Sequence, residues 1–182
     1  MSTAGSLRRA AAVIRAGGIV GYATEAVFGL GCDPRNRRAV DRLRRIKQRS
    51  TRKGFILIAA RPAQLAAYVT SFPPRALASW PGPHTWLLPA RPGIASRLTG
   101  QSATIAVRVT AHPQAAALCR ACGTAIVSTS ANRAGQRPAR SHREVLRRFG
   151  RLVDYVLPGH VGGLGRPTPI TDAVSGRLVR PG

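Results

Sequence analysis

Short apolar segments alternate with amphipathic segments along this 182-residue chain, and this alternation restricts its possible folds more than any other feature. Segments that fit buried strands lie at residues 19–22, 55–60, 85–88, 103–109 and 125–127. Apolar residues have helical spacing at residues 7–16, 38–47, 62–69, 112–122 and 141–149. Because strands and helices do not follow a strict βαβ order, we expect an α/β or α+β domain with a mixed sheet.

Turn and cap signals refine these boundaries. Ser141 is followed three residues later by Glu144, which predicts a capping box at a helix start. Prolines and glycines at residues 72–74 and 80–83 predict turns. Further short strands are expected at residues 152–157, 169–172 and 178–180. No linker or internal repeat divides the chain, so we expect residues 1–182 to form a single domain without a C-terminal extension domain.

The sequence offers no membrane or export signal. No stretch approaches the roughly 18 consecutive apolar residues of a membrane span, and the apolar run at residues 10–14 is shorter than a signal-peptide core. The odd cysteine count fits a reducing compartment, so we expect a cytoplasmic protein that does not bind membranes. Cys119 and Cys122 end an apolar helical run without a second cysteine pair, which favours ordinary buried residues over a metal site.

The charge of the chain is strongly unbalanced. It has 29 Lys plus Arg against 6 Asp plus Glu, for a formal net charge of +23. Such a charge favours a polyanionic partner or substrate, with nucleic acid first and nucleotide phosphate second. An arginine-rich genome composition would explain the surface charge equally well. Lys47 and Lys53 are the only lysines, which indicates a place that requires a compact ammonium.

Several familiar catalytic and nucleotide-binding motifs are absent from the sequence. It has no G-x-x-x-x-G-K-[ST] loop, no G-x-G-x-x-G fingerprint and no G-x-S-x-G elbow. The six carboxylates are not paired by sequence, and the four histidines are scattered. Any chemistry is therefore expected to rely on cations and hydrogen-bond donors.

Two hydroxyl-bearing segments follow expected strands. Residues 22–31 leave a strand for a glycine-containing turn, where Thr24 could offer its hydroxyl and backbone N–H to a ligand. Residues 128–132 carry three hydroxyls and an amide directly after the strand at 125–127. Such groups suit a phosphate or carboxylate, although a plain strand exit and an asparagine turn would explain the same residues.

Three cations lie between an expected helix end and the next strand, namely Lys47, Arg49 and Lys53. Cations at this position either offset the helix dipole or clamp a triphosphate. Together with the two hydroxyl-bearing segments, they predict an anion-binding pocket at one end of a sheet.

Six motifs carry a resemblance to a known family. They are YATEAVFGLGCD at 22–33, KQR at 47–49 with KG at 53–54, WPGPHTW at 80–86, AVRV at 106–109 with HP at 112–113, STSAN at 128–132 and LVRPG at 178–182. From about residue 7 to residue 182, the chain resembles the YrdC-like family of threonylcarbamoyl-AMP synthases, in its short single-domain bacterial form. The resemblance implies an open, twisted mixed β-sheet with flanking helices around a positively charged cavity.

The resemblance also implies a reaction and its partners. Such enzymes condense L-threonine, bicarbonate and ATP to threonylcarbamoyl-adenylate and pyrophosphate, for the N6-threonylcarbamoyladenosine modification of tRNA. Magnesium is expected to accompany the nucleotide, with no metal site formed by the protein. The implied partners are the proteins that transfer the threonylcarbamoyl group, and tRNA itself through direct contact.

The family motifs assign roles to individual residues. Lys47 and Arg49 are expected to be catalytic and to bind ATP. The other ATP-binding residues are expected to be Lys53, Thr104, Ser130, Asn132, Arg140 and Arg180. Threonine is expected to bind to Thr24, Arg108 and Ser128, with Arg108 gripping its carboxylate.

The chain departs from the family pattern at several places. Ala23 and Ala26 replace Pro and Thr, Gly54 stands where many relatives have Pro, and Pro169 interrupts a Ser-Thr-hydrophobic-hydrophobic-Asp pattern, so Thr168 is given no ligand role. Two rival functions stay open beside the synthase. One is a non-catalytic RNA-binding or ribosome-assembly module, and the other is a carbamoyl-transfer domain, normally part of a larger protein with metal-binding fingers.

Overall fold

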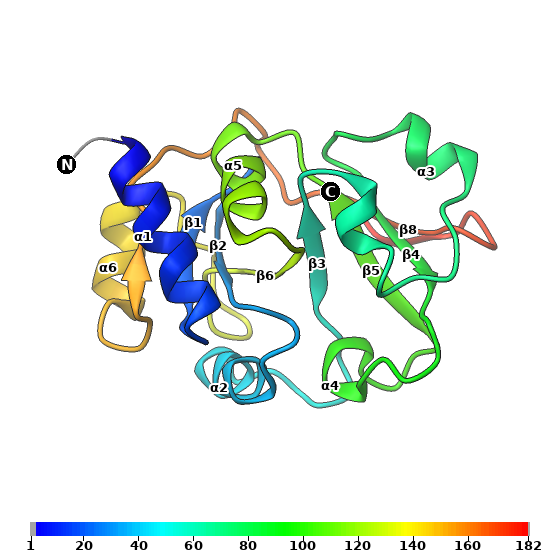
Figure 1. The fold of residues 1–182 in the computed structure, drawn as a ribbon, viewed down its shortest axis with the longest axis horizontal. Coiled ribbons are helices and arrows are strands. Elements are labelled where there is room, and N and C mark those ends of the chain that lie inside the picture. Colours follow the sequence, from blue (N-terminus) through cyan, green and yellow to red (C-terminus); the bar gives the residue numbers. More distant parts are fainter. Residues whose placement is uncertain (1–2, 182) are drawn as a thin grey trace.

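Helices flank a single mixed sheet in the computed structural model, which describes residues 3–181 (Figure 1). The strands are β1 (Val20–Ala23), β2 (Phe28–Gly31), β3 (Ile56–Ala59), β4 (Thr85–Pro89), β5 (Thr104–Val109), β6 (Ile126–Ser130), β7 (Tyr155–Val156), β8 (Ile170–Asp172) and β9 (Leu178–Arg180). The helices are α1 (Thr3–Arg15), α2 (Arg37–Lys47), α3 (Pro74–Ala78), α4 (Ser96–Thr99), α5 (Pro113–Cys122) and α6 (His142–Phe149). The mixed-sheet α/β fold expected from the sequence is confirmed.

Strand β6 has a central place in this sheet. Within residues 3–181 the strand order is β7-β1-β2-β6-β3-β5-β4-β8-β9. β6 is antiparallel to both β2 and β3, whereas β3 is parallel to β5. The register places Ser130 opposite Gly29 and Ser128 opposite Ile56. The hydroxyl residues of β6 therefore lie between the first hairpin and the strand that follows α2.

Different helices cover the two faces of the sheet. α1 and α5 lie together over one face (Figure 1), where Leu118 of α5 shares a buried cluster with Ile58. On the other face, Leu43 of α2 and Phe149 of α6 belong to a second, larger cluster. Because side chains alternate along a strand, Ile56 lies on the same face as Ile58, two positions further along the strand. The pocket described below lies on this same face of the sheet.

The prediction of a helix over residues 62–69 is wrong. Only Pro62–Leu65 is helical, and it is a 3₁₀ helix. The Gln64 side chain accepts a hydrogen bond from Ala60 N at 2.8 Å and donates one to Cys119 O at 2.8 Å. This side chain therefore ties the turn to β3 and α5, and long-range bonding replaces a longer helix.

Other expected boundaries are also corrected. β6 runs on to Ser130, although its strand was expected at residues 125–127, because β2 and β3 pair with the hydroxyl residues on both sides. Residues 28–31 form the paired strand β2 and not a turn. α3 and α4 have no expected counterpart, since helices of five and four residues are too short to show a helical period.

Polar caps fix where two helices begin. Ser141 Oγ accepts a hydrogen bond from Glu144 N at 3.2 Å, and Glu144 Oε2 accepts one from Ser141 N at 3.2 Å. This pair is the capping box that the sequence predicts. At the start of α2, Asn36 Oδ1 accepts from Ala39 N at 3.0 Å. α2 is thereby fixed at its start, and its last residue is Lys47.

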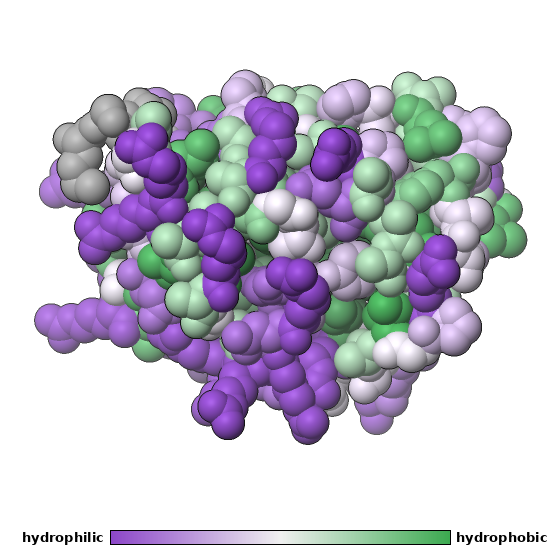
Figure 2. Space-filling view, in the orientation of Figure 1, coloured by the Kyte–Doolittle hydropathy of each residue, from purple (hydrophilic) through white to green (hydrophobic). Residues whose placement is uncertain are grey.

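Exposed arginines contribute much of the hydrophilic surface over α1 and α2 (Figure 2). They include Arg8, Arg9, Arg15, Arg37, Arg38 and Arg45. Much of the net charge of +23 is therefore carried by solvent-exposed helix faces. In the part of the chain that the structure describes, no helix has the length and apolar character needed to cross a membrane. The three cysteines are free and buried, as expected for the C-x-x-C pair.

We predict that Gly31→Ala destabilises the protein by about 1–3 kcal/mol, because an added methyl group would overpack the sheet. Its Cβ would press against Val127 O and lie 2.9 Å from the Tyr22 ring. Gly29→Ala, on the same strand, is the matched control, since its Cβ would have contacts of 3.4 Å. Urea denaturation measures both free energies of unfolding, and equal losses would contradict this account of β2.

Candidate active site

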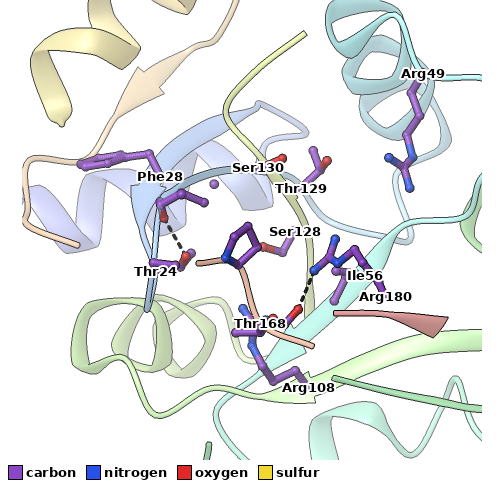
Figure 3. Close-up of a pocket in the computed structure, with 14 residues that line it drawn as sticks. Thr24, Phe28, Arg49, Ile56, Arg108, Ser128, Thr129, Ser130, Thr168 and Arg180 are labelled. Carbon is purple, nitrogen blue, oxygen red and sulfur yellow. Dashed lines mark hydrogen bonds between the residues drawn. The ribbon is translucent and has the colours of Figure 1, made fainter. Parts of the chain in front are cut away.

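A pocket of about 680 Å³, counting its open mouth, lies on the α5 face of the sheet (Figure 3). Its walls come from the β1–β2 turn, β6, β5 and the C-terminal segment. Six of the predicted site residues line it: Thr24, Arg49, Arg108, Ser128, Ser130 and Arg180. In Figure 3, Arg49 and Arg180 lie on the side opposite Thr24, with Ser128 between them. Segments far apart in the sequence thus meet in one cavity.

The remaining predicted site residues lie outside the lining. They are Lys47, Lys53, Thr104, Asn132 and Arg140. Lys53 is exposed, and the Thr104 hydroxyl is hydrogen-bonded to Ser102 Oγ at 2.8 Å. Arg140 is exposed and donates to Gly165 O at 3.0 Å and Leu164 O at 3.2 Å. The ATP-binding roles of these residues stay predictions.

Lys47 is buried behind the pocket wall, at the end of α2. Its Nζ donates hydrogen bonds to Ser130 O, to Asn132 O and, at 3.1 Å, to Asn132 Oδ1. Ser130 Oγ also donates to Asn132 Oδ1, at 2.5 Å. The ammonium therefore orders the turn that follows β6. Burial, with the nearby charge of Arg49, lowers the pKa of Lys47 to about 8.

Arg49 and Arg180 are guanidinium groups without a carboxylate partner. Neither forms an ion pair with any acidic residue between positions 3 and 181. Arg49 Nε donates to Gly54 O at 3.1 Å, and Arg180 Nη2 donates to Thr168 O at 2.8 Å. Burial and the charges of Arg44 and Arg180 lower the pKa of Arg49. An anion bound between Arg49 and Arg180 would relieve their repulsion.

Arg108 differs from these two arginines because it has a buried carboxylate partner. Its Nη2 lies 3.2 Å from Glu25 Oε2. Its Nη1 donates to Thr168 Oγ1 at 2.6 Å and to Thr85 Oγ1 at 3.2 Å. Thr110 Oγ1 in turn donates to Glu25 Oε1 at 2.5 Å. The pocket therefore holds one charge-compensated guanidinium, that of Arg108, and two uncompensated ones, with Arg180 and Arg108 both bonded to Thr168.

Sequence reasoning missed several lining residues and the partner of Arg108. Ile56, Thr129, Pro167 and Thr168 line the pocket without having been assigned a role. Glu25 lies in the first family motif. The chain has only one other glutamate, and the rarity of this residue type could have marked Glu25 as a candidate site residue. Its pairing with a residue 83 positions away could not be read from spacing.

Two of the departures from the family pattern, Ala23 and Gly54, have local structural reasons. Ala23 N donates to Gln114 Oε1 at 3.2 Å, a bond that proline could not make. A Cβ on Gly54 would lie 2.6 Å from Leu98 O, so the approach of α4 requires glycine there. Ala26 lines the pocket with a methyl group where relatives have a hydroxyl. Pro169 O accepts from Thr85 N at 3.1 Å, which holds Thr85 beside Arg108.

Thr24 uses its hydroxyl proton within its own turn. Thr24 Oγ1 donates to Val27 O at 2.6 Å, and Thr24 N donates to the same oxygen at 3.1 Å. The hydroxyl oxygen keeps its lone pairs, so towards a ligand it acts as an acceptor. Thr24 is therefore suited to a ligand that donates, such as an amine.

Comparison with known proteins identifies the family. The Sua5/YciO/YrdC family model, described as telomere recombination, matches residues 12–182. A threonylcarbamoyl-AMP synthase of Halorhodospira halophila is 56% identical over 178 residues, covering 96% of this chain and 93% of its own. The crystal structure of P. abyssi Sua5 complexed with L-threonine has a TM-score of 0.90 and 31% identity, covering 97% of this chain and 54% of that chain. This chain thus spans about half of that Sua5.

A second solved structure supports the assignment. E. coli YciO has a TM-score of 0.83 and 27% identity, covering 96% of this chain and 87% of its own. The match extends over nearly the whole chain in sequence and in structure, and it confirms the resemblance drawn from the motifs. The chain therefore belongs to the Sua5/YciO/YrdC family.

Proposed function

We propose that this protein is a threonylcarbamoyl-AMP synthase, an enzyme that condenses L-threonine, bicarbonate and ATP. The observation that carries the proposal is a single pocket with two kinds of guanidinium, Arg108 with a carboxylate partner and Arg49 and Arg180 without one. These two kinds of guanidinium suit a substrate amino acid and a nucleotide polyphosphate. The names of relatives that are 51–56% identical support the synthase over an RNA-binding module or a carbamoyl-transfer domain.

Threonine is proposed to bind beside Arg108. Its carboxylate would accept hydrogen bonds from the guanidinium, as arginine geometry favours. Its amine would donate to the lone pairs of Thr24 Oγ1, whose proton is held by Val27 O. Ser128 lines the cavity beside Thr24 and offers a further hydroxyl. The crystal structure of Sua5 complexed with L-threonine supports this choice of ligand.

The phosphates of ATP are proposed to bind between Arg49 and Arg180. These two charges have no acidic partner in residues 3–181 and would stabilise the negative charge that develops on departing pyrophosphate. Ser130 lines this part of the cavity, and Lys47 holds its backbone oxygen from behind. We propose that Lys47 and Asn132 act on ATP through the position of Ser130.

The proposed reaction needs no protein nucleophile. The amine of threonine adds to the carbon of bicarbonate with loss of water, which gives a carbamate. A carbamate oxygen then attacks the α-phosphorus of ATP, and the bond from that phosphorus to the bridging oxygen breaks. Pyrophosphate leaves with the electron pair, and threonylcarbamoyl-adenylate remains. The protein contributes by holding the reactants together and by neutralising phosphate charge.

The residues present do not fit a magnesium ion held by the protein. The lining offers guanidinium and hydroxyl groups, and none of its residues is acidic. Glu25 is already committed to Arg108 and Thr110. Mg²⁺ prefers carboxylate and phosphate oxygens, so we propose that any Mg²⁺ arrives on the phosphates of ATP, and no step here is assigned to it. Direct tRNA contact, the transfer proteins and a cytoplasmic location stay predictions.

The function is tested by incubating purified protein with ATP, threonine and labelled bicarbonate. We expect threonylcarbamoyl-adenylate and pyrophosphate in equal amounts, with no product when threonine is omitted. Mass spectrometry identifies the adenylate, and a coupled assay measures pyrophosphate. Binding of RNA by the protein without any adenylate would instead support the non-catalytic module.

We predict that Lys47→Ala lowers kcat/KM for ATP by about 100-fold, because the turn that carries Ser130 loses the ammonium that orders it. Arg45→Ala is the matched control, since Arg45 is an exposed residue of the same helix. Steady-state kinetics with varied ATP gives the comparison, and circular dichroism checks the fold. Equal kinetics for the two variants would remove Lys47 from the site.

The lowered pKa of Lys47 predicts a pH dependence of stability. Its folded-state pKa of about 8 lies below the usual 10.5, so the unfolded chain binds more protons between these values. The free energy of unfolding of the wild type, minus that of Lys47→Met, should therefore rise between pH 8 and 10.5. Urea denaturation at several pH values measures this difference, in which the effects of other titrating groups cancel. A flat difference would mean that the pKa is not lowered.

A further inference from the structure

Glu25 is a buried carboxylate that touches the pocket only through Arg108. Its side chain is 8% exposed, and it does not line the cavity. Glu25 Oε1 accepts a hydrogen bond from Thr110, which is itself buried. Because Glu25 reaches the cavity only through another side chain, it can act on a ligand by setting the position and charge of that side chain.

Glu25 and Arg108 form an ion pair, but no hydrogen bond joins the two side chains. Glu25 Oε2 and Arg108 Nη2 lie 3.2 Å apart, yet Glu25 Oε2 and Arg108 Nε form no hydrogen bond with residues 3–181. The directed bonds of Arg108 run from Nη1 to Thr85 and Thr168. The carboxylate thus compensates the charge of Arg108. Because Nε is buried and Nη1 is bonded to both threonines, Nη2 is left as the guanidinium nitrogen for a ligand carboxylate.

Charge compensation distinguishes Arg108 from the other two guanidinium groups of the pocket. Arg108 and Glu25 together carry no net charge, whereas Arg49 and Arg180 carry two uncompensated positive charges. Threonine in its zwitterionic form is also neutral, and ATP is a polyanion. A polyanion is drawn to the two guanidinium groups with net positive charge, and the neutral Arg108–Glu25 pair is left to the amino acid.

We propose that Glu25 is a positioning residue that holds Arg108 for the carboxylate of threonine and, by cancelling the charge of Arg108, directs the phosphates of ATP to Arg49 and Arg180. This inference rests on the proposed synthase function. Without Glu25, Arg108 becomes an unpaired buried cation that competes for phosphate. Glu25 is not proposed as a proton acceptor, because it does not reach the cavity and Oε1 is occupied by Thr110.

The test compares Glu25→Gln with Glu144→Gln, which changes the only other glutamate of the chain, in the capping box of α6. We expect Glu25→Gln to raise KM for threonine by about 10- to 100-fold, with little change in KM for ATP. Pyrophosphate should inhibit the wild type competitively against ATP alone. In Glu25→Gln it should also compete with threonine, an effect that loss of stability alone would not produce. Glu144→Gln should behave as the wild type.

A double variant tests whether Glu25 acts through Arg108. In the Arg108→Gln background, Glu25→Gln should cause no further rise in KM for threonine, and the neutral pair should unfold at a higher temperature than either single variant. If the rises in KM for threonine of the two single variants instead add up in the double variant, the proposal is overturned. If Glu25→Gln does not fold, Thr110→Val carries the test, since it keeps the charge, removes the bond to Glu25 Oε1 and should raise KM for threonine several-fold.

Two results overturn the proposal while leaving the synthase function intact. One is an unchanged KM for threonine in a folded Glu25→Gln protein. The other is a fall in kcat alone that higher pH reverses, as expected for a catalytic base. A wild type that makes no adenylate contradicts the proposed function itself. In that case calorimetric titration of threonine into the wild type and Glu25→Gln still measures the role of Glu25, and equal affinities would overturn it.

Discussion

The pairing of β6 with β2 on one side and β3 on the other is the constraint on which the pocket depends. This register sets Ser130 against Gly29 and Ser128 against Ile56, so hydroxyl groups take strand positions between two other walls of the cavity. The same pairing carries Ser130 to the end of α2, where Lys47 holds the following turn. A shift of β6 by one residue would reverse the faces of its side chains and remove these hydroxyls from the cavity.

Buried charge imposes the second constraint. Four buried or half-buried cations, Arg44, Lys47, Arg49 and Arg108, lie near the pocket together with the exposed Arg180. Glu25 is the only carboxylate that forms an ion pair with any of these five among the described residues. Backbone carbonyls compensate the others, as when Arg44 Nη1 donates to Ser50 O at 2.6 Å. Carbonyl dipoles orient a cation without cancelling its charge, which suits a site that must attract phosphate.

Much of the fold was predictable because its signals are local. The apolar period placed α2 and α5 to within one residue, and the Ser141–Glu144 capping box formed as expected. The failures occurred where distant residues decide the structure. β6 is longer than its apolar residues indicate because β2 pairs with Thr129 and Ser130 and β3 pairs with Ser128. The predicted helix at 62–69 is replaced by a turn in which the Gln64 side chain bonds to Ala60 and to the distant Cys119. Six predicted site residues line the pocket, because the family motifs identify the positions of site residues. The motifs do not identify which side chains contact one another.

The partners of Arg108 show why the geometry of a site identifies its ligands better than the composition of the chain does. The net charge of +23 pointed first to nucleic acid, yet most arginines are exposed, on helices and loops, and say little about the cavity. What distinguishes one arginine from another is its neighbours: hydroxyls and a carboxylate around Arg108, and a carbonyl with a second cation beside Arg49. Identical side chains thereby acquire different preferences for a neutral amino acid and a polyphosphate. In a chain this rich in arginine, selectivity must come from the scarce acidic residues, and the position of Glu25 is therefore more informative than the number of arginines.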